Sequence, residues 1–268
     1  MLENLKQPVG IFDAGIGSYD IVRKIRAAYP AQDTVYLADR ASFPYGAKSE
    51  DELEDSIFRA VDYLTGLGVG AIILASNAPT ITVLPRLLPR FRLPVLGVYP
   101  PIRAALEGVG ADGVVAVIGA RVLTDSAALR DYVAGEAGGG SSDRVAFAEA
   151  GGLIELVETG TFLSDPATTQ RTVSDFVEAL QQRHPRLAGI TLSSTHLPWL
   201  KQFFEQADPR LKLFDPADEV TEQFRPLVTA GSGKLVTLVT QSPQHPFHEF
   251  QATLDRLTLD LQPRLVQI

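Results

Sequence analysis

The chain has 268 residues, of which 45% are hydrophobic and 21% are charged, a balance typical of a globular protein rather than a disordered or fibrous one. Its net charge of −8 argues against a nucleic-acid-binding protein, because the phosphate backbone attracts a basic surface. The sequence has no cysteine and four histidines, which excludes disulfides, thiol nucleophiles and cysteine-ligated metals and argues against a histidine-rich metal site.

The longest apolar run without a charge covers residues 69–83. Gly70, Ser76, Asn77 and Pro79 interrupt it, and it is shorter than the roughly 18 apolar residues of a membrane span. The first ten residues lack the basic start and apolar stretch of a secretory signal. We therefore expect a cytoplasmic protein that does not enter a membrane.

Short apolar runs alternate with segments of helical spacing, which predicts an α/β fold with parallel strands and crossover helices. Several runs are continuously apolar, as expected for strands covered on both faces. The predicted strands are residues 9–13, 34–38, 71–75, 95–98, 114–119, 144–148, 189–193, 212–215 and 235–240. The predicted helices are residues 17–28, 49–67, 80–88, 123–135, 168–183, 197–206 and 218–228.

Two features concern the organisation of the chain. The segment GEAGGGSSD, residues 135–143, predicts a loop between a helix and a strand. A weak internal repeat relates VGIFDAGIGS (9–18) to VAVIGARVLTDS (115–126), and IILASNAP (72–79) to ITLSSTHLP (190–198). Such a duplication would place two similar groups of residues face to face across a cleft, although two α/β halves also look alike by chance.

Ligands of open parallel sheets bind beyond the carboxyl ends of the strands, so the residues after each predicted strand are site candidates. Asp13 ends the first strand and could orient an ammonium group or a base; its alternative role is a helix N-cap. The turn that follows it, DAGIGS, allows backbone amides to approach an anion, but it lacks the third glycine of a dinucleotide-binding motif.

Further candidates follow later strands. The loop SFPYG places Tyr45 where a ligand carboxylate could be held, although Pro-Tyr-Gly is also an ordinary turn. Asn77 and Thr195 each follow a serine at a strand end and could bind a carboxylate or amine, or simply cap the next helix. His196 is the histidine at a strand end and the best acid or base candidate. We expect the remaining histidines at the surface: His184, His245 and His248.

Seven segments, taken in order, resemble the motif series of the glutamate racemase family. They are GIFDAGIGS, YLADRASFPYGAKS, AIILASNAPT, LPVLGV, VAVIGAR, LVETG and LSSTHLPWL, and they span about residues 9 to 240. The resemblance implies a cofactor-independent amino-acid racemase of two pseudo-symmetric α/β domains, commonly a homodimer, with its pocket between the domains; the composition already argues against a metal site. One domain would comprise residues 1–97 and 210–268, and the other residues 98–209.

The family's chemistry, as the resemblance implies it, uses two cysteines on opposite faces of the substrate's α-carbon. In this chain those positions hold Ser76 and Ser194. The site residues that match the family pattern are Asp13, Pro44, Tyr45, Gly46, Asn77, Thr195, His196 and Glu158, the last matching a glutamate that assists the histidine. The departures beside the lost thiols are Ala14, Ala78, Pro79, Ala120 and Leu197. These accompanying changes favour natural divergence over a laboratory replacement of two cysteines.

Three functions stay open. The first is a protein that binds an amino acid or small dicarboxylate with little or no cysteine-type racemisation, because a serine hydroxyl is a far weaker proton acceptor than a thiolate. Such a protein could instead bind a macromolecular partner. The second is an enzyme with one-sided acid–base chemistry from Asp13, Glu158 and His196. The third is residual racemisation in which His196 or water replaces a thiol.

A serine hydrolase is a weaker alternative. Ser194 and His196 are too close in sequence for their geometry to be inferred, and the sequence has no nucleophile-elbow motif. The cations within the motif segments are Arg40, Arg121 and Lys48, whose orientation the sequence does not give.

Overall fold

The structure of the protein is a computed structural model that describes residues 5–138 and 140–268. The chain forms two compact units: unit 1 comprises Met1–Val98 and Ala217–Ile268, and unit 2 comprises Tyr99–Pro216. The chain thus leaves unit 1 after Val98 and returns to it at Ala217, later than the residue 210 that the sequence suggests. Unit 1 is therefore assembled from two separate stretches of sequence, whereas unit 2 is continuous.

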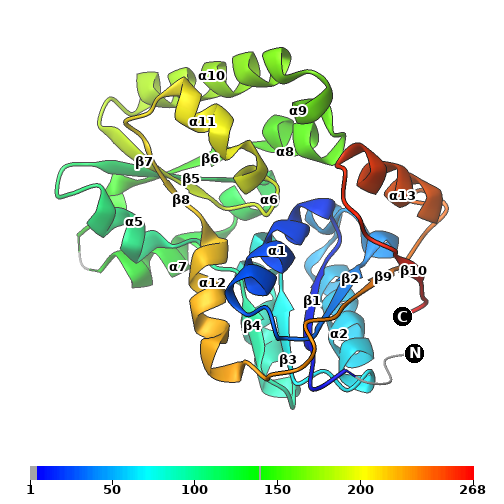
Figure 1. Cartoon of the computed structure of the whole chain (residues 1–268). Coiled ribbons are helices and arrows are strands. Elements are labelled where there is room, and N and C mark those ends of the chain that lie inside the picture. The colour runs from blue at the N-terminus through cyan, green and yellow to red at the C-terminus, as the bar shows by residue number, and fades with distance from the viewer. Residues whose placement is uncertain (1–4, 139) are drawn as a thin grey trace. The chain divides into compact units, whose positions relative to one another are not determined.

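Unit 1 is built around a parallel sheet with the strand order β10-β9-β2-β1-β3-β4 (Figure 1). Its strands are β1 (Val9–Asp13), β2 (Thr34–Ala38), β3 (Ala71–Leu74), β4 (Val95–Gly97), β9 (Leu235–Val239) and β10 (Arg264–Leu265). Every neighbouring pair is parallel, as the alternation of strands and helices predicts. β10 is not among the predicted strands, because two residues are too few to produce a recognisable pattern.

The central strands of unit 1 are covered on both faces, which explains their continuously apolar sequences. Every residue of β1, β2 and β3 is buried. On one face, Phe12 and Leu74 belong to the same hydrophobic cluster as Ile57 and Leu64 of α2 (Glu50–Gly66). This packing holds the sheet rigid beneath the loops that follow its strands.

Unit 2 contains a second parallel sheet, with the strand order β6-β5-β7-β8 (Figure 1). Its strands are β5 (Val114–Gly119), β6 (Val145–Glu149), β7 (Leu187–Leu192) and β8 (Lys212–Phe214). In both sheets the first strand lies between the second and the third, and the fourth lies beyond the third. The internal repeat of the sequence therefore corresponds to a shared strand order. The α/β fold with mostly parallel sheets is confirmed.

Most predicted helices are present, although several are divided or extended. The helices are α1 (Tyr19–Ala28), α2, α3 (Asn77–Thr82), α4 (Leu84–Leu87), α5 (Ile102–Gly108), α6 (Arg121–Thr124), α7 (Ala127–Ala137), α8 (Gly151–Glu158), α9 (Thr161–Ser164), α10 (Pro166–Arg183), α11 (Lys201–Ala207), α12 (Pro216–Phe224) and α13 (Phe247–Arg256). Four helices are not among those predicted from the sequence: α5, α8, α9 and α13. Each is short, and α8 and α13 begin beside a glycine pair or a proline that reads as a loop signal.

The predicted helix over residues 80–88 is wrong as a single element. α3 ends at Thr82 and α4 begins at Leu84. Pro85 has no N–H with which to bond the carbonyl of Ile81, so one α-helix cannot continue through it.

The predicted helix over residues 123–135 is also two elements. The Ser126 side chain accepts the N–H of Leu129 at 3.1 Å and so caps the start of α7, separating it from α6. The predicted loop over residues 135–143 begins later than expected, because α7 continues to Ala137. Gly138, with a positive φ of 67°, ends the helix, as a glycine does most easily.

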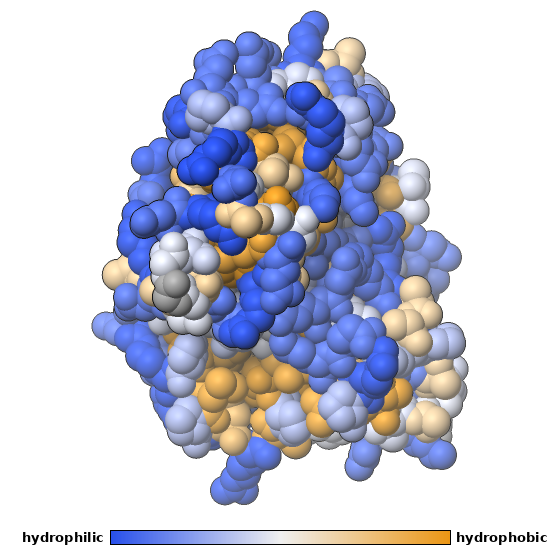
Figure 2. Space-filling view, turned by 90° about the vertical axis from the view of Figure 1, so that its left-hand side faces the viewer, coloured by the Kyte–Doolittle hydropathy of each residue, from blue (hydrophilic) through white to orange (hydrophobic). Residues whose placement is uncertain are grey.

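On the face shown in Figure 2, hydrophilic residues predominate and apolar residues are visible in smaller areas between them. The exposed large hydrophobic residues among those described are Leu88, Leu163, Val228 and Leu265. Within residues 5–138 and 140–268, no helix combines the length and the apolar character that crossing a membrane requires.

Candidate functional site

The candidate residues lie at the carboxyl ends of the strands in both units. In unit 1, Asp13 is the last residue of β1, Asp39 follows β2 directly, and Ser76 lies two residues after β3. In unit 2, Ser194 lies two residues after β7, and His196 follows it in the same loop. Because parallel strands all end at one edge of a sheet, each unit gathers its candidates at that edge.

Ser76 and Ser194 occupy equivalent places in the two sheets. β3 and β7 are the third strands of the shared order. In each unit, the residue before the serine donates its N–H to the first strand: Ala75 to the carbonyl of Phe12 at 2.8 Å, and Ser193 to that of Ile118 at 2.9 Å. The two serines thus leave the third strand by the same local path.

Asp13 is a buried carboxylate, 4% exposed, at the end of β1. The residues that precede η1 (Ile16–Ser18) and α1 are Gly15 and Ser18, so Asp13 is not the N-cap of either helix. Its role, in a ligand site or in the turn that leads into these helices, stays a prediction. A buried carboxylate at a strand end is a candidate for binding a cationic group or for moving a proton.

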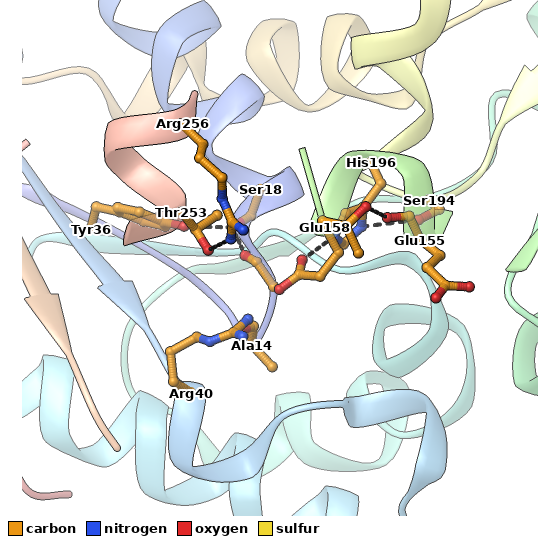
Figure 3. Close-up of polar contacts among 12 residues, drawn as sticks. Ala14, Ser18, Tyr36, Arg40, Glu155, Glu158, Ser194, His196, Thr253 and Arg256 are labelled. Atoms are coloured by element: carbon orange, nitrogen blue, oxygen red, sulfur yellow. Dashed lines mark hydrogen bonds and ion pairs between the residues drawn. The ribbon is translucent and has the colours of Figure 1, made fainter. Parts of the chain in front are cut away.

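A buried arginine supports the turn after Asp13. The Nη1 atom of Arg40 donates to the carbonyl of Ala14 at 3.1 Å, and the guanidinium lies 4.1 Å from the ring centre of Phe43 (Figure 3). Of the cations that the motif segments contain, Arg121 is exposed and Lys48 half-buried. Arg40 therefore brings a fixed positive charge to the edge of the sheet in unit 1.

The loop around Tyr45 is anchored to Asp39. The Tyr45 hydroxyl donates to Oδ2 of Asp39 at 3.1 Å, and Thr240, which directly follows β9, donates to Oδ1 at 2.8 Å. Burial raises the pKa of the Tyr45 phenol well above its usual value, and the charges of Asp39 and Asp13 raise it further. Tyr45 therefore stays neutral and holds the loop, while the neighbouring Pro44 and Gly46 are exposed.

The loop after β3 contains an unsatisfied buried acceptor. Ser76 is half-buried and makes no side-chain cap to α3 within the described residues. The Nδ2 atom of Asn77 donates to the carbonyl of Val98 at 2.8 Å, but its Oδ1 atom is buried without a partner in the described part of the chain. Such an atom costs about 1–3 kcal/mol unless a ligand donor or water reaches it. The next residue, Ala78, is half-buried and offers no polar group.

In unit 2, Glu158, His196 and Ser194 form a chain of polar contacts. Glu158 is the last residue of α8, and its Oε2 atom lies 2.8 Å from Nε2 of His196. The other ring nitrogen, Nδ1, lies 3.5 Å from Oγ of Ser194 (Figure 3). His196 is buried and Glu158 and Ser194 are half-buried. The structure thus brings three candidate residues together, of which Glu158 and His196 are 38 positions apart in the sequence.

The positions at which the sequence predicts departures from the family pattern carry apolar side chains in both units. Ala14 is buried in the turn after β1, and Ala120 is half-buried after β5. Leu197 is buried at the start of η6 (Leu197–Leu200), directly after His196. Thr195, which is predicted to match the pattern, is buried beside it. Ala14, Ala120 and Leu197 offer a ligand no hydroxyl group.

The other histidines are only partly as expected. His248 is exposed, whereas His184 and His245 are half-buried, and the ring of His245 packs edge-on against Phe43 with centres 5.0 Å apart. Within residues 5–138 and 140–268, no group of three or more His, Asp or Glu side chains is arranged to hold a metal ion.

Thr240 is not among the predicted site residues. It is the last residue of a predicted strand, so the rule that parallel strands end at one edge could have identified it. Its partner Asp39 directly follows another predicted strand, residues 34–38. Only the pairing of β9 with β2 shows that the two side chains meet.

The chain is similar to known glutamate racemases along most of its length, although no family model matches it. It is 30% identical over 253 residues to a glutamate racemase of Deinococcus radiodurans, which covers 89% of this chain and 83% of that protein. It is 32% identical over 241 residues to one of Ectopseudomonas mendocina, with 88% and 86% covered.

Solved structures agree with the sequence comparison. A glutamate racemase from Thermus thermophilus in complex with β-chloro-D-alanine is 27% identical, covers 99% of both chains and superposes with a TM-score of 0.75. A Bacillus anthracis glutamate racemase, 21% identical with 98% of both chains covered, shares the fold with a TM-score of 0.79. Sequence and fold therefore show that this chain belongs to the glutamate racemase family.

Proposed function

We propose that this family member binds an amino acid or a small dicarboxylate at its strand ends and performs little or no cysteine-type glutamate racemisation. The observation that carries the proposal is the equivalent placement of Ser76 and Ser194, two residues beyond the third strand of each sheet. These are the positions to which the motifs assign the family's two thiols. The chain has no cysteine to replace them.

The chemical consequence follows from acidity. Inversion at the α-carbon requires one group that removes a proton and another that returns one on the opposite face. A thiol with a pKa near 8.5 supplies both forms close to neutral pH, whereas a serine hydroxyl is almost never ionised there. Because each positioned base contributes about 10²- to 10⁴-fold, losing both thiols removes most of the rate.

Binding is supported by groups that remain. Asp13 is a buried carboxylate at one strand end, and Asn77 presents a buried carbonyl oxygen that lacks a partner among the described residues. Both accept hydrogen bonds and suit the ammonium group of an amino acid. Among the related solved structures, one from Francisella tularensis is a complex with D-glutamate, which makes glutamate the first ligand to test.

The decisive experiment restores the thiols. We expect wild-type protein to interconvert L- and D-glutamate at least about 10⁴-fold more slowly than the double variant Ser76→Cys with Ser194→Cys, as measured by chiral chromatography. Ser193→Cys is the matched control, because Ser193 is buried and bonded to Thr191 rather than directed at the loop. A wild-type rate equal to that of the double variant would overturn the proposal.

Binding is tested separately by thermal unfolding with increasing glutamate, aspartate and related dicarboxylates. A ligand that binds only the folded state raises the unfolding temperature with its concentration. A panel without any shift contradicts the binding proposal and favours the alternative that the chain binds a macromolecular partner.

The contact of Ser194, His196 and Glu158 favours a second candidate function, one-sided proton transfer. His196 is placed to accept a proton through Ser194 or from a substrate directly, while Ser76 contacts no histidine among the residues that the structure describes. Substrate incubated in heavy water would then gain deuterium at the α-carbon without inversion. Exchange that is absent in wild type, or unchanged in His196→Asn, contradicts this candidate.

A further inference from the structure

The contact between Glu158 and His196 determines which ring nitrogen of His196 carries the proton. An ionised carboxylate only accepts hydrogen bonds, so Nε2, 2.8 Å from Oε2 of Glu158, carries the hydrogen and donates it. Nδ1 then has a free electron pair, and it is the nitrogen that lies 3.5 Å from Oγ of Ser194. The Ser194 hydroxyl therefore donates to a base that the carboxylate orients.

This arrangement is the general one for an activated hydroxyl nucleophile. A hydroxyl becomes reactive when an adjacent base can take its proton and a third group holds that base, and the first contact is commonly long before substrate binds. All three residues belong to unit 2, so the arrangement depends only on the fold of that unit. Ser194 is half-buried rather than enclosed in the core.

The other serines of the two loops differ in this respect. Ser193 is buried and its hydroxyl lies 2.8 Å from that of Thr191, so it faces the interior. Ser76 occupies the equivalent place in unit 1, but within the described residues its hydroxyl contacts no base. One strand-end serine therefore has a histidine beside its hydroxyl, and the other provides an internal comparison.

Donors for a developing negative charge are also available in the same loop. No acceptor among the described residues takes the backbone N–H of Ser194 or that of His196. Backbone N–H groups without a partner beside a nucleophile can stabilise an oxyanion, which contributes strongly to acyl transfer.

We propose that Ser194 is a nucleophile that accepts acyl groups from esters of small carboxylic acids, with His196 as its base and Glu158 as a positioning residue. The Oγ atom bonds to the ester carbonyl carbon while its proton passes to Nδ1 of His196. The carbon–oxygen bond to the alcohol then breaks, and the alcohol leaves with that proton. Water, deprotonated by His196, attacks the acyl-serine, releases the carboxylic acid and restores Ser194.

The test uses p-nitrophenyl acetate and a fluorophosphonate probe on the whole protein. We expect release of p-nitrophenol, and mass spectrometry of the labelled wild-type protein to find the phosphonyl group on Ser194 and not on Ser76 or Ser193. Because the site is read from the wild type, this result does not depend on the stability of a variant. Labelling elsewhere, or no labelling above that of heat-unfolded protein, overturns the proposal.

Variants then assign the roles. Ser194→Ala and His196→Asn should lower ester cleavage by about 10²-fold or more, whereas Ser193→Ala should leave it within about twofold. A Ser194→Ala protein that unfolds at the wild-type temperature and still cleaves the ester overturns the proposal. Racemisation and deuterium exchange are measured on amino acids, whereas acyl transfer is measured on an ester. A negative result for the proposed function can therefore be distinguished from a negative result for acyl transfer.

The positioning role of Glu158 has its own control. Glu155 lies on the same helix, and Figure 3 shows its side chain directed away from His196. Glu158→Gln should slow labelling of Ser194 by about tenfold or more, Glu158→Asp should restore part of the loss, and Glu155→Gln should change nothing. Equal losses for Gln and Asp at position 158, together with a lowered unfolding temperature, would show a merely structural role and contradict the assignment.

Discussion

Asp33 shows how one buried side chain holds distant segments of unit 1 together. Its carboxylate accepts the backbone N–H groups of Lys6 at 2.8 Å and of Ser232 and Lys234 at 2.9 Å. Burial raises the pKa of Asp33, but these hydrogen bonds outweigh burial and lower the pKa below its usual value. The carboxylate is therefore more stable charged than neutral in the folded protein.

The first prediction concerns Asp33→Asn. The amide keeps one acceptor oxygen and turns an N–H group toward the backbone donors, so we expect a loss of about 1.5–3 kcal/mol in the free energy of unfolding at pH 7. Because the folded-state pKa is lowered, the contribution of Asp33 is present above the unfolded pKa of about 3.9 and disappears as pH falls below it. Urea unfolding from pH 7 to pH 3 checks this, and a difference that stays constant over that range contradicts it.

The site residues illustrate what residue identity alone can and cannot predict. Ser76 and Ser194 are both strand-end serines followed by a polar residue, but the sequence places a histidine two positions after Ser194 and an alanine two positions after Ser76. In the structure Nδ1 of His196 lies 3.5 Å from Oγ of Ser194, whereas Ser76 contacts no histidine among the described residues. The sequence does not show that Glu158, the last residue of α8, contacts the other ring nitrogen of His196.

At the scale of elements, the starts of two helices depend on serine caps. Ser49 accepts the N–H of Glu52 at 3.3 Å, and the Glu52 side chain accepts the N–H of Ser49 at 2.9 Å, which completes a capping box on α2. Ser126 caps α7 through a single bond to the N–H of Leu129.

The second prediction is that Ser49→Ala and Ser126→Ala each lower the free energy of unfolding by about 0.5–2 kcal/mol. The loss at Ser49 should be the larger, because its replacement also frees the Glu52 carboxylate. The variant Ser141→Ala serves as control, since Ser141 precedes η5 (Ser142–Arg144) without a side-chain cap. Unfolding in urea gives the values, and equal stability of Ser49→Ala and the control would refute the prediction.

Close packing of β4 against the two short helices after β3 gives the third prediction. A Cβ atom on Gly97 would lie 2.5 Å from Cγ2 of Thr80 and 2.7 Å from Cδ2 of Leu84. Thr80 cannot move freely, because its hydroxyl accepts the N–H of Val98 at 3.1 Å. We expect Gly97→Ala to destabilise the protein by about 1–3 kcal/mol, whereas Gly66→Ala, where a Cβ meets nothing within 4 Å, should be close to neutral. Similar unfolding temperatures for both variants would contradict this account.

The elements that the sequence predicts well are those whose pattern is local. Continuous apolar runs identify β1, β2 and β5 because strands covered on both faces need no alternation. The break between α3 and α4 also has a local cause, since Pro85 cannot donate a helical hydrogen bond. The apolar residues around Pro85 nevertheless have helical spacing, which led to the prediction of one continuous helix.

At the scale of the whole molecule, the two units differ in how their sequence is assembled. Unit 2 is one continuous segment, whereas β2 of unit 1 pairs on one side with β9, which comes after unit 2 in the chain. The bonds that Asp33 receives from Ser232 and Lys234, and that Asp39 receives from Thr240, also come from that returning segment.

The fourth prediction follows from this asymmetry. We expect a fragment of residues 99–216 to fold cooperatively, and a fragment of residues 1–98 not to fold, because it leaves β2 without β9 and leaves Asp33 and Asp39 with fewer donors. Circular dichroism with thermal unfolding distinguishes the two, and adding residues 217–268 to the second fragment is the control that should restore structure. A cooperative transition of residues 1–98 alone contradicts the prediction.

The fold class, most strands, the order of the strand-end residues and the resemblance to the family can all be predicted from the sequence, because these depend on local patterns of apolar and polar residues. Which of the strand-end residues meet becomes visible only in the folded chain. Asp39 contacts Thr240, and His196 joins Glu158 to Ser194, because strands and helices distant in sequence pack side by side. Contacts of this kind depend on packing over the whole unit, and no local pattern encodes them.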